Sequence, residues 1–290
     1  MARKFFTGKA AMTEIARDFL IYNGILRPVS DCPVTLSGQS KYLYEVFRVQ
    51  QGVPVFIENH LDRLWQSAML EKTHIPFTRQ TILDNIFRLI GSNPANDGNV
   101  KIYVSTTCNE DLIWLVYFTP HQYPSPSQFK NGVAIKIFNA ERPNPNAKIM
   151  DTLLRRATER IKTDEDVNEV LLVDQYGYIT EGSRSNVFFV EGDSIVTPPL
   201  HQILEGVTRK QVLELCKSAQ IPVVERLVHI SALSQIVGLF LTGTSRRVLP
   251  VNRIDNIKIH VNHPIVRQLQ CLLENRVREY ISEFNARQNL

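Results

Sequence analysis

The sequence has 290 residues, enough for one large domain or two ordinary ones, each with its own core. Apolar residues make up 43% of it and charged residues 21%, as in soluble globular proteins and unlike disordered ones. The formal net charge is only +4, and no run of five or six basic residues occurs, so nucleic-acid binding has little support.

The four cysteines, Cys32, Cys108, Cys216 and Cys271, show no Cys-x-x-Cys spacing. This pattern argues against a disulfide framework and against a metal site, and it is typical of a reduced, cytoplasmic protein. No long uninterrupted apolar stretch follows the N-terminal Met-Ala-Arg-Lys-Phe-Phe. We therefore expect neither a signal peptide nor a membrane span.

The first half of the chain predicts a sheet with two helices. Residues 19–22 read as a strand followed by an Asn-Gly turn. Residues 44–50 alternate, and a Gln-Gly turn joins them to residues 53–57, which predicts a hairpin. A helix is expected from about residue 59. A second helix is expected from Thr78 to Asn93, with Gly91 as its C-cap.

Two more strands, residues 99–105 and 111–118, complete this half. The stretch after them is rich in proline and serine and favours a linker. We therefore predict an N-terminal α/β domain over residues 1–123, a linker over 124–132, and a C-terminal domain over 133–290.

The second half opens with a predicted strand at residues 133–138. A helix is expected to begin near Lys148, with an apolar face of Met150, Leu153, Leu154, Ala157 and Ile161.

Further on, the spacing of apolar residues predicts more strands and two more helices. Thr208 fits the N-cap of a helix from Arg209 to Ser218, and a long amphipathic helix is expected from His263 to about Arg287. The predicted strands are residues 169–174, 187–190, 194–197 and 239–243.

Two residues of this half have the types that amine chemistry needs. A lysine can condense with an aldehyde when it is deprotonated, and a carboxylate can hold a proton on a nitrogen heterocycle. Lys148 lies at the predicted start of a helix, and Glu181 follows 33 residues later in Thr-Glu-Gly-Ser-Arg-Ser-Asn186. Taken alone, each fits a solvated surface residue.

Together, in this order, they resemble the fold-type IV enzymes that use pyridoxal phosphate. These include branched-chain aminotransferases, D-amino-acid aminotransferases and aminodeoxychorismate lyase. The resemblance implies that Lys148 is the Schiff-base lysine and that Glu181 faces the pyridine nitrogen. The Glu-Gly-x-x-x-Asn pattern implies that Asn186 and its turn pack against the cofactor.

Three further stretches resemble phosphate-binding parts of that family. Leu204-Glu-Gly-Val-Thr-Arg implies Gly206, Val207 and Thr208 as phosphate binders at a helix N-terminus. Thr242-Gly-Thr-Ser adds Thr244 and Ser245. His60-Leu-Asp-Arg-Leu implies that Arg63 binds the phosphate, although an exposed helix face would explain the same spacing.

The resemblance also implies a two-domain α/β (α+β) fold of the D-amino-acid-aminotransferase type, with a small N-terminal and a larger C-terminal domain. It implies a homodimer with a shared active site, and amino acids and keto acids as substrates. No nucleic-acid or membrane partner is expected.

The reaction and substrate stay open at this point. A branched-chain-type aminotransferase is our first hypothesis. Aminodeoxychorismate lyase, which eliminates pyruvate, and a non-catalytic cofactor-binding relative are the alternatives. Tyr42, Tyr44 and Lys101 lie where the family places substrate contacts, while core packing for the tyrosines and a solvated strand position for the lysine remain the competing interpretations.

Overall fold

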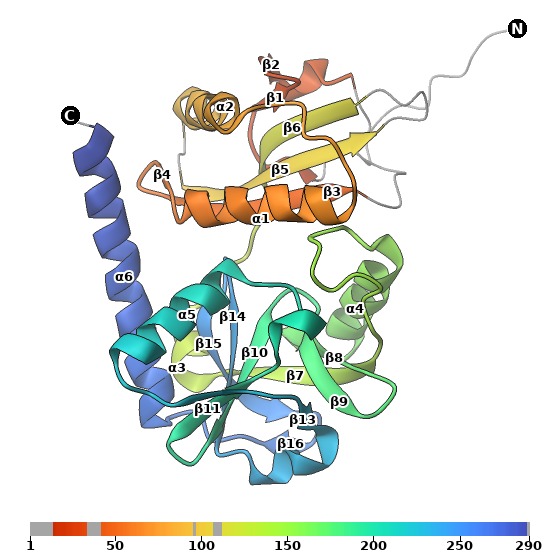
Figure 1. Cartoon of the computed structure of the whole chain (residues 1–290), viewed down its shortest axis with the longest axis vertical. Coiled ribbons are helices and arrows are strands. Elements are labelled where there is room, and N and C mark those ends of the chain that lie inside the picture. The colour runs from red at the N-terminus through yellow and green to blue at the C-terminus, as the bar shows by residue number, and fades with distance from the viewer. Residues whose placement is uncertain (1–13, 34–41, 95–96, 107–111, 289–290) are drawn as a thin grey trace, which may run out of the picture. The chain divides into compact units, whose positions relative to one another are not determined.

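The computed structural model describes residues 14–33, 42–94, 97–106 and 112–288. The chain divides into two compact units, Met1–His121 and Gln122–Leu290, and each unit has a sheet of its own (Figure 1). Part of the predicted linker is helical: α3, Pro126–Asn131, has Ser125 as its N-cap, and Ser125 forms a capping box with Gln128.

The first unit contains an antiparallel sheet in the order β2-β1-β6-β5-β3-β4. The predicted strands at residues 19–22, 44–50, 99–105 and 112–118 are confirmed, while Asp111, with which the last was expected to begin, lies outside the described residues. Residues 55–57 do not continue the hairpin, because the chain turns into a helix there. The strands are β1 Phe19–Tyr22, β2 Ile25–Pro28, β3 Leu43–Gln50, β4 Val53–Pro54, β5 Gly98–Thr106 and β6 Leu112–Thr119.

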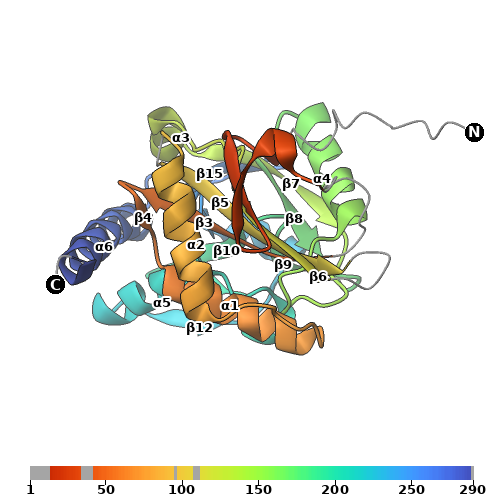
Figure 2. The ribbon, with the colours of Figure 1, turned by 90° about the horizontal axis from the view of Figure 1, so that it is seen from above.

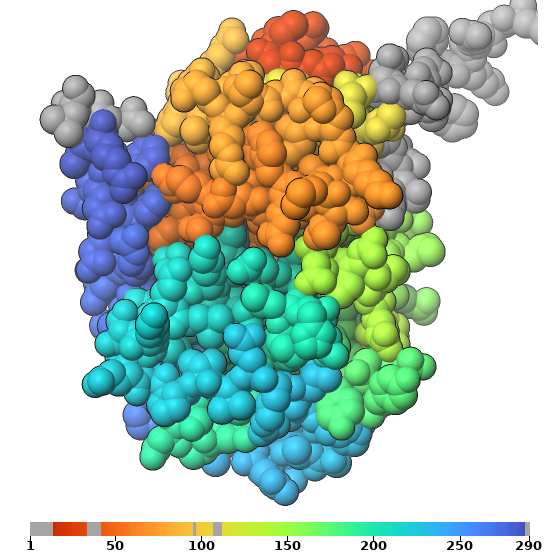
Figure 3. Space-filling model, viewed as in Figure 1, coloured from red at the N-terminus to blue at the C-terminus, as the bar shows by residue number. Residues whose placement is uncertain are grey.

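Two helices, α1 Ile57–Leu70 and α2 Arg79–Ser92, pack on this sheet, α1 against β3 and α2 against β1 and β6 (Figure 2). Thr78 caps α2 by accepting a hydrogen bond from the Thr81 N–H. The prediction of Gly91 as C-cap was wrong: α2 continues through it and ends at Ser92, with Asn93 as its C-cap. The outer face of α1, coloured orange, is exposed on the surface (Figure 3), where Met69 keeps 74% of its accessible area.

The second unit is built on a ten-stranded mixed sheet in the order β12-β11-β10-β14-β15-β7-β8-β9-β13, with β16 pairing to β15. The pairs β11–β12, β15–β7 and β7–β8 are parallel. The strands are β7 Val133–Asn139, β8 Glu169–Val173, β9 Tyr178–Gly182, β10 Asn186–Glu191, β11 Ser194–Thr197, β12 Val223–Glu225, β13 Val228–His229, β14 Gly238–Gly243, β15 Arg247–Ile254 and β16 Ile257–Lys258.

Both faces of this sheet are covered, which explains why β10 and β14 are apolar along most of their length. Val187 and Phe189 of β10 face one core, and the intervening Phe188 and Val190 face the other. The second core is completed by α5, Val207–Ser218, and α6, Pro264–Gln288, which pack on each other (Figures 1 and 2).

The helix after Lys148 differs from its prediction. Helix α4 is Thr152–Asp164, because the Asp151 carboxylate accepts hydrogen bonds from the N–H groups of Leu153 and Leu154 and so fixes the first turn. Lys148 therefore lies in an irregular segment before the helix. Leu153 is 77% exposed and does not belong to an apolar contact face.

The prediction for α5 also needs correction. Its N-cap is Gly206 and not Thr208, which lies in the first turn of the helix. The long C-terminal helix is confirmed as α6. Among the residues that the structure describes, none of the helices has the length and apolar character to cross a bilayer.

Candidate functional site

Lys148 lies in the segment that connects β7 to α4, and it is half-buried. The neighbouring Asn146 fixes this segment, because its side-chain amide donates to the carbonyls of Leu200 at 2.6 Å and Ile203 at 3.1 Å. The charge of Lys148 also acts on Glu181, where it lowers the pKa and so favours the ionised carboxylate. The predicted lysine and glutamate are thus near enough for their charges to interact.

Glu181 lies near the end of β9 and is 3% exposed. The pairing of β8 with β9 shifts register here: Leu171 pairs with Gly182, and Val173 pairs with Ile179. The extra residue on β9 forms a bulge at Thr180 and Glu181, a feature that often redirects a side chain at a functional site.

A nearby arginine that the sequence did not single out contacts Glu181. Arg142 Nε lies 2.8 Å from Glu181 Oε1, and Arg142 also donates to the carbonyl of Ser183 at 2.7 Å. This contact is an ion pair, and among the described residues the buried carboxylate oxygen has no hydrogen-bond donor with good geometry. The other oxygen accepts from the Leu204 N–H at 3.4 Å.

Two effects oppose each other at Glu181. Burial raises the pKa of its carboxyl above the ordinary value, and the charges of Arg142 and Lys148 act against that rise without cancelling it. The site therefore holds an acid that needs positive neighbours, or a further N–H donor, to stay ionised.

The N-terminus of α5 lies against Asn186. The Asn186 side-chain amide donates to the carbonyl of Leu204 at 2.9 Å, and a Cβ at Gly206 would overlap the Asn186 side-chain oxygen. Gly206, the N-cap, provides no side-chain hydrogen bond to the first turn, which contains Val207 and Thr208. A first turn without a side-chain cap, next to glycine backbone, suits an anion such as phosphate.

The turn between β14 and β15 carries Thr244 and Ser245. Pairing of Asn186 with Thr242 places this turn next to the one between β9 and β10. The Arg246 side chain donates to the carbonyl of Arg184 at 3.4 Å, which links the two turns directly. The predicted cofactor contacts on these two turns therefore gather at one end of the second unit's sheet.

In the first unit, Arg63 is held by a carboxylate. Glu45 on β3 is fully buried and accepts from Arg63 Nε and a terminal guanidinium nitrogen, each at 2.7 Å, and it contacts His60 Nδ1 at 2.9 Å. Burial alone would raise the pKa of Glu45, but Arg63 and His60 lower it to about 2. His60 and Arg63 thus point inward from α1, and the alternative of an exposed face is excluded.

The predicted substrate contacts form a second polar cluster in that unit. Lys101 on β5 is 5% exposed, and its Nζ donates to the Tyr42 hydroxyl at 3.0 Å and to Glu14 at 3.1 Å. The rings of Tyr42, Tyr44 and Tyr117 surround the same ammonium, with centroids 4.9 to 5.8 Å away. Lys101 is therefore not a solvated strand residue.

Residues 42–254 match the family model for class IV aminotransferases. The chain belongs to this family. Because members of the family depend on pyridoxal phosphate, the chain is an aminotransferase of this class with that cofactor.

Two curated relatives resemble most of the chain. A probable branched-chain-amino-acid aminotransferase of Thermotoga maritima is 31% identical over 234 residues, which cover 77% of this chain and 80% of the relative. A D-alanine aminotransferase of Bacillus licheniformis is 26% identical over 275 residues, which cover 89% and 96%.

Two solved structures share the fold. The branched-chain amino acid aminotransferase from Escherichia coli aligns with a TM-score of 0.76 at 20% identity, covering 88% of this chain and 92% of that one. A hypothetical aminotransferase from Mycobacterium tuberculosis in its PLP-bound form also aligns with a TM-score of 0.76 at 20% identity, covering 89% and 98%. The predicted D-amino-acid-aminotransferase-like α/β fold is thus confirmed.

Proposed function

We propose that this aminotransferase acts on branched-chain α-amino acids and transfers their amino group to a keto acid through pyridoxal phosphate bound at Lys148. One observation above all supports the proposal: Glu181 is buried, one of its oxygens has no hydrogen-bond donor with good geometry among the described residues, and the charge of Lys148 acts on it. The name of the Thermotoga maritima relative supports the substrate class.

The residues of the second unit fit the cofactor. A protonated pyridine nitrogen would give the buried Glu181 oxygen, which already faces the Arg142 charge, a well-aligned donor. The phosphate suits the first turn of α5 at Gly206, Val207 and Thr208, and the hydroxyl-bearing turn at Thr244 and Ser245. Asn186 holds the glycine turn against β10.

Each residue then has a defined task. When bound, the cofactor supplies an electron sink that acidifies the proton on the substrate Cα. Lys148 would hold the cofactor's aldehyde carbon until the substrate amine displaces it, and the freed lysine amine would then take the Cα proton and return it. Glu181 keeps the ring nitrogen protonated, and Arg142 keeps Glu181 ionised.

Two assignments in the first unit complete the proposal. Arg63, oriented by Glu45, binds the cofactor phosphate, and the Lys101 cluster with Tyr42 and Tyr44 binds a substrate carboxylate. We further propose a homodimer with a shared active site, and a cytoplasmic location, which the cysteine pattern favours.

The test begins with the absorption spectrum of the purified protein. The wild type should show a visible cofactor band that borohydride fixes covalently to the peptide containing Lys148, and Lys148→Ala should lack this adduct. An adduct on another lysine would overturn the assignment.

A donor panel then tests the reaction. L-leucine, D-alanine and L-glutamate are each mixed with the holoenzyme, and we expect bleaching of the band with L-leucine and formation of its keto acid. Bleaching by D-alanine alone would refute the substrate class. Pyruvate release from aminodeoxychorismate without a keto-acid acceptor would instead establish a lyase.

The proposed role of Lys101 in substrate binding can be tested separately from cofactor binding. Lys101→Met should raise KM for the amino donor by about tenfold while the cofactor band is kept, because the ammonium would be lost from a substrate contact. An unchanged KM with reduced thermal stability would assign Lys101 to packing alone.

A further inference from the structure

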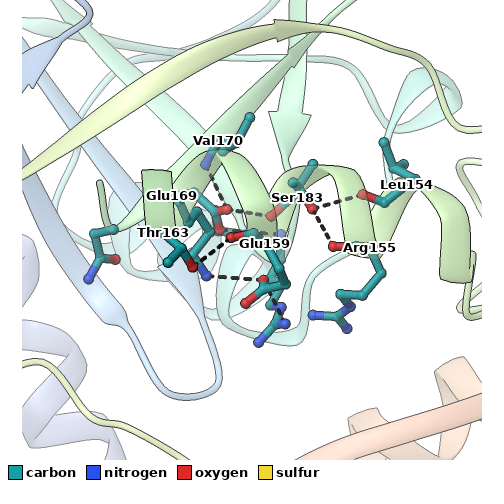
Figure 4. A network of polar contacts seen from close by, with 12 residues as sticks. Leu154, Arg155, Glu159, Thr163, Glu169, Val170 and Ser183 are labelled. Atoms are coloured by element: carbon teal, nitrogen blue, oxygen red, sulfur yellow. Dashed lines mark hydrogen bonds and ion pairs between the residues drawn. The ribbon is translucent and has the colours of Figure 1, made fainter. Parts of the chain in front are cut away.

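Glu169, the first residue of β8, is a completely buried carboxylate at the centre of a hydrogen-bond network (Figure 4). One oxygen accepts from the Ser183 hydroxyl at 2.6 Å and from the Val170 N–H at 2.9 Å. The other accepts from the Ser185 hydroxyl at 2.9 Å and from the Arg184 N–H at 3.2 Å. Three consecutive residues of one turn thus converge on a single side chain.

The same carboxylate holds the second turn of the site. Arg246, which follows Thr244 and Ser245, lies 3.1 Å from Glu169 Oε2. The Arg246 side chain also donates to the carbonyls of Asn168 and Arg184, each at 3.4 Å. Glu169 therefore connects the turn between β9 and β10 with the turn between β14 and β15.

The packing leaves this arrangement little freedom. A Cβ at Gly182 would overlap the Ser185 hydroxyl and come within 3.2 Å of Glu169 Cγ. The Ser183 N–H donates to the Val170 carbonyl at 2.8 Å, which fixes the turn on β8 as well. Glu181 and Asn186 flank this turn. Their positions are therefore fixed by the contacts of the turn residues that separate them in the sequence.

The surroundings of Glu169 favour the ionised form of its carboxyl. Burial raises the pKa of its carboxyl, but Arg246, the Ser183 hydroxyl, the Lys162 charge and the Val170 N–H outweigh burial and leave the pKa below the ordinary value. An ionised oxygen accepts these hydrogen bonds more strongly than a neutral amide does. In Glu169→Gln, the side-chain N–H₂ group would also point at hydroxyl and N–H groups that donate to the carboxylate in the wild type.

From this geometry we infer that Glu169 is a positioning residue for the cofactor site: it sets the turn that carries Glu181 and Asn186 and ties it to the turn that carries Thr244 and Ser245. The inference rests on the proposed function of those four residues. Glu169 itself acts through them and has no assigned contact with substrate or cofactor.

The matched experiment compares Glu169→Gln with Glu159→Gln in the full-length chain. Glu159 on α4 is the control, because it pairs with the Arg184 side chain at 2.6 Å from outside the turn and is 41% exposed. The cofactor is removed, pyridoxal phosphate is titrated back, and Kd is measured by absorbance. The pH midpoint of the cofactor band and the kcat and KM for L-leucine are then measured.

Glu169→Gln should raise Kd for pyridoxal phosphate by about tenfold or more. It should also shift the pH midpoint of the band by about half a unit or more, since the distance from Glu181 to the ring nitrogen would change. The kcat should fall with KM nearly unchanged, and Glu159→Gln should behave like the wild type.

A wild-type Kd and band midpoint in Glu169→Gln would overturn the inference. If that variant fails to fold, Ser183→Ala and Ser185→Ala replace it: each removes one hydroxyl and keeps the ion pair, and each should raise Kd less than the two changes together. A double variant with wild-type Kd would equally refute the role. A wild type without a Lys148 adduct would instead refute the proposed function.

Discussion

At the scale of single residues, each unit contains buried carboxylates that face arginine side chains. Glu45, Glu169 and Glu181 are 0%, 0% and 3% exposed, and each faces an arginine. Burying a charge without a partner costs several kcal/mol, and each arginine lowers the pKa of the carboxyl that it faces. Removing one member of a pair should therefore change the pKa of the remaining carboxyl or the free energy of unfolding of the protein.

Arg142→Met should move the acidic limb of the pH–activity profile upward. Arg142 lowers the pKa of Glu181 against burial, so without Arg142 the carboxyl protonates at a higher pH and activity is lost there. We expect a shift of about one unit in the kcat/KM profile. Arg226→Met, which removes a surface ion pair with Glu191, should leave the profile unchanged. An unmoved acidic limb in Arg142→Met would contradict the role of Arg142.

Glu45→Gln should destabilise the first unit at neutral pH by roughly 3 kcal/mol, because the Arg63 guanidinium loses its buried partner. The folded-state pKa of Glu45 is lowered from 4.5 to about 2, so its stabilisation is present above pH 4.5 and is lost as pH falls toward 2. Urea unfolding at several pH values should show the two proteins converging across this window.

Asp62→Asn is the control for that measurement. It removes an ion pair between Asp62 on α1 and Arg79, but both side chains are about half exposed or more, at 61% and 49%. Exposed pairs contribute roughly 0 to 1 kcal/mol. An equal loss in both variants would show that burial of Glu45 is not the cause.

At the scale of elements, the start of α5 is set by the contact between Gly206 and Asn186. The Gly206 backbone, φ −72° and ψ 131°, is open to any residue, so only the side-chain overlap excludes alanine. Gly206→Ala should raise the Kd for pyridoxal phosphate by about tenfold, as the displaced Asn186 releases the Leu204 carbonyl.

A double variant separates the steric cause from other effects. Because Gly206→Ala acts through Asn186, its effect on Kd should be much smaller when Asn186→Ala is already present. In contrast, Gly91→Ala places a methyl group where nothing lies within 4 Å, and it should stabilise α2 by up to about 1 kcal/mol. If the effects of Gly206→Ala and Asn186→Ala on Kd were simply additive, Gly206→Ala would not act through Asn186.

Elements also show where sequence patterns suffice. Alternation correctly predicted β3, a continuous apolar run predicted β10, and apolar helical faces predicted α2 and α6. In contrast, β15 was not predicted, because Arg247 and Arg253 near its ends and an internal proline hide a strand whose centre is buried. The start of α4 was misplaced because Asp151, not Lys148, caps it.

The candidate site was predictable in part for the same reason. Lys148, Glu181 and the α5 N-terminus lie in short motifs with a preserved order. Arg142 and Glu169 did not stand out, because a buried charge looks like a surface charge in sequence and its partner is far away along the chain. Arg246 lies 77 residues from Glu169, and no local spacing links them.

At the scale of the whole molecule, each of the two units has its own sheet and its own cluster of buried charges. The family resemblance implies that two chains share each active site. Light scattering should therefore give a mass twice that of one chain, with or without added pyridoxal phosphate. A monomer that retains full transaminase activity would contradict the shared site.

The parallel pairing of β15 with β7 joins Val251 to Val133, so strands far apart in the second unit's sequence lie side by side. During vectorial synthesis β7 leaves the ribosome long before this neighbour does. Until translation reaches β15, β7 has one exposed edge, which is open to chaperones or to other nascent chains. A stop codon before residue 247 would thus release a polypeptide whose sheet is split in the middle, with every assigned catalytic group already made.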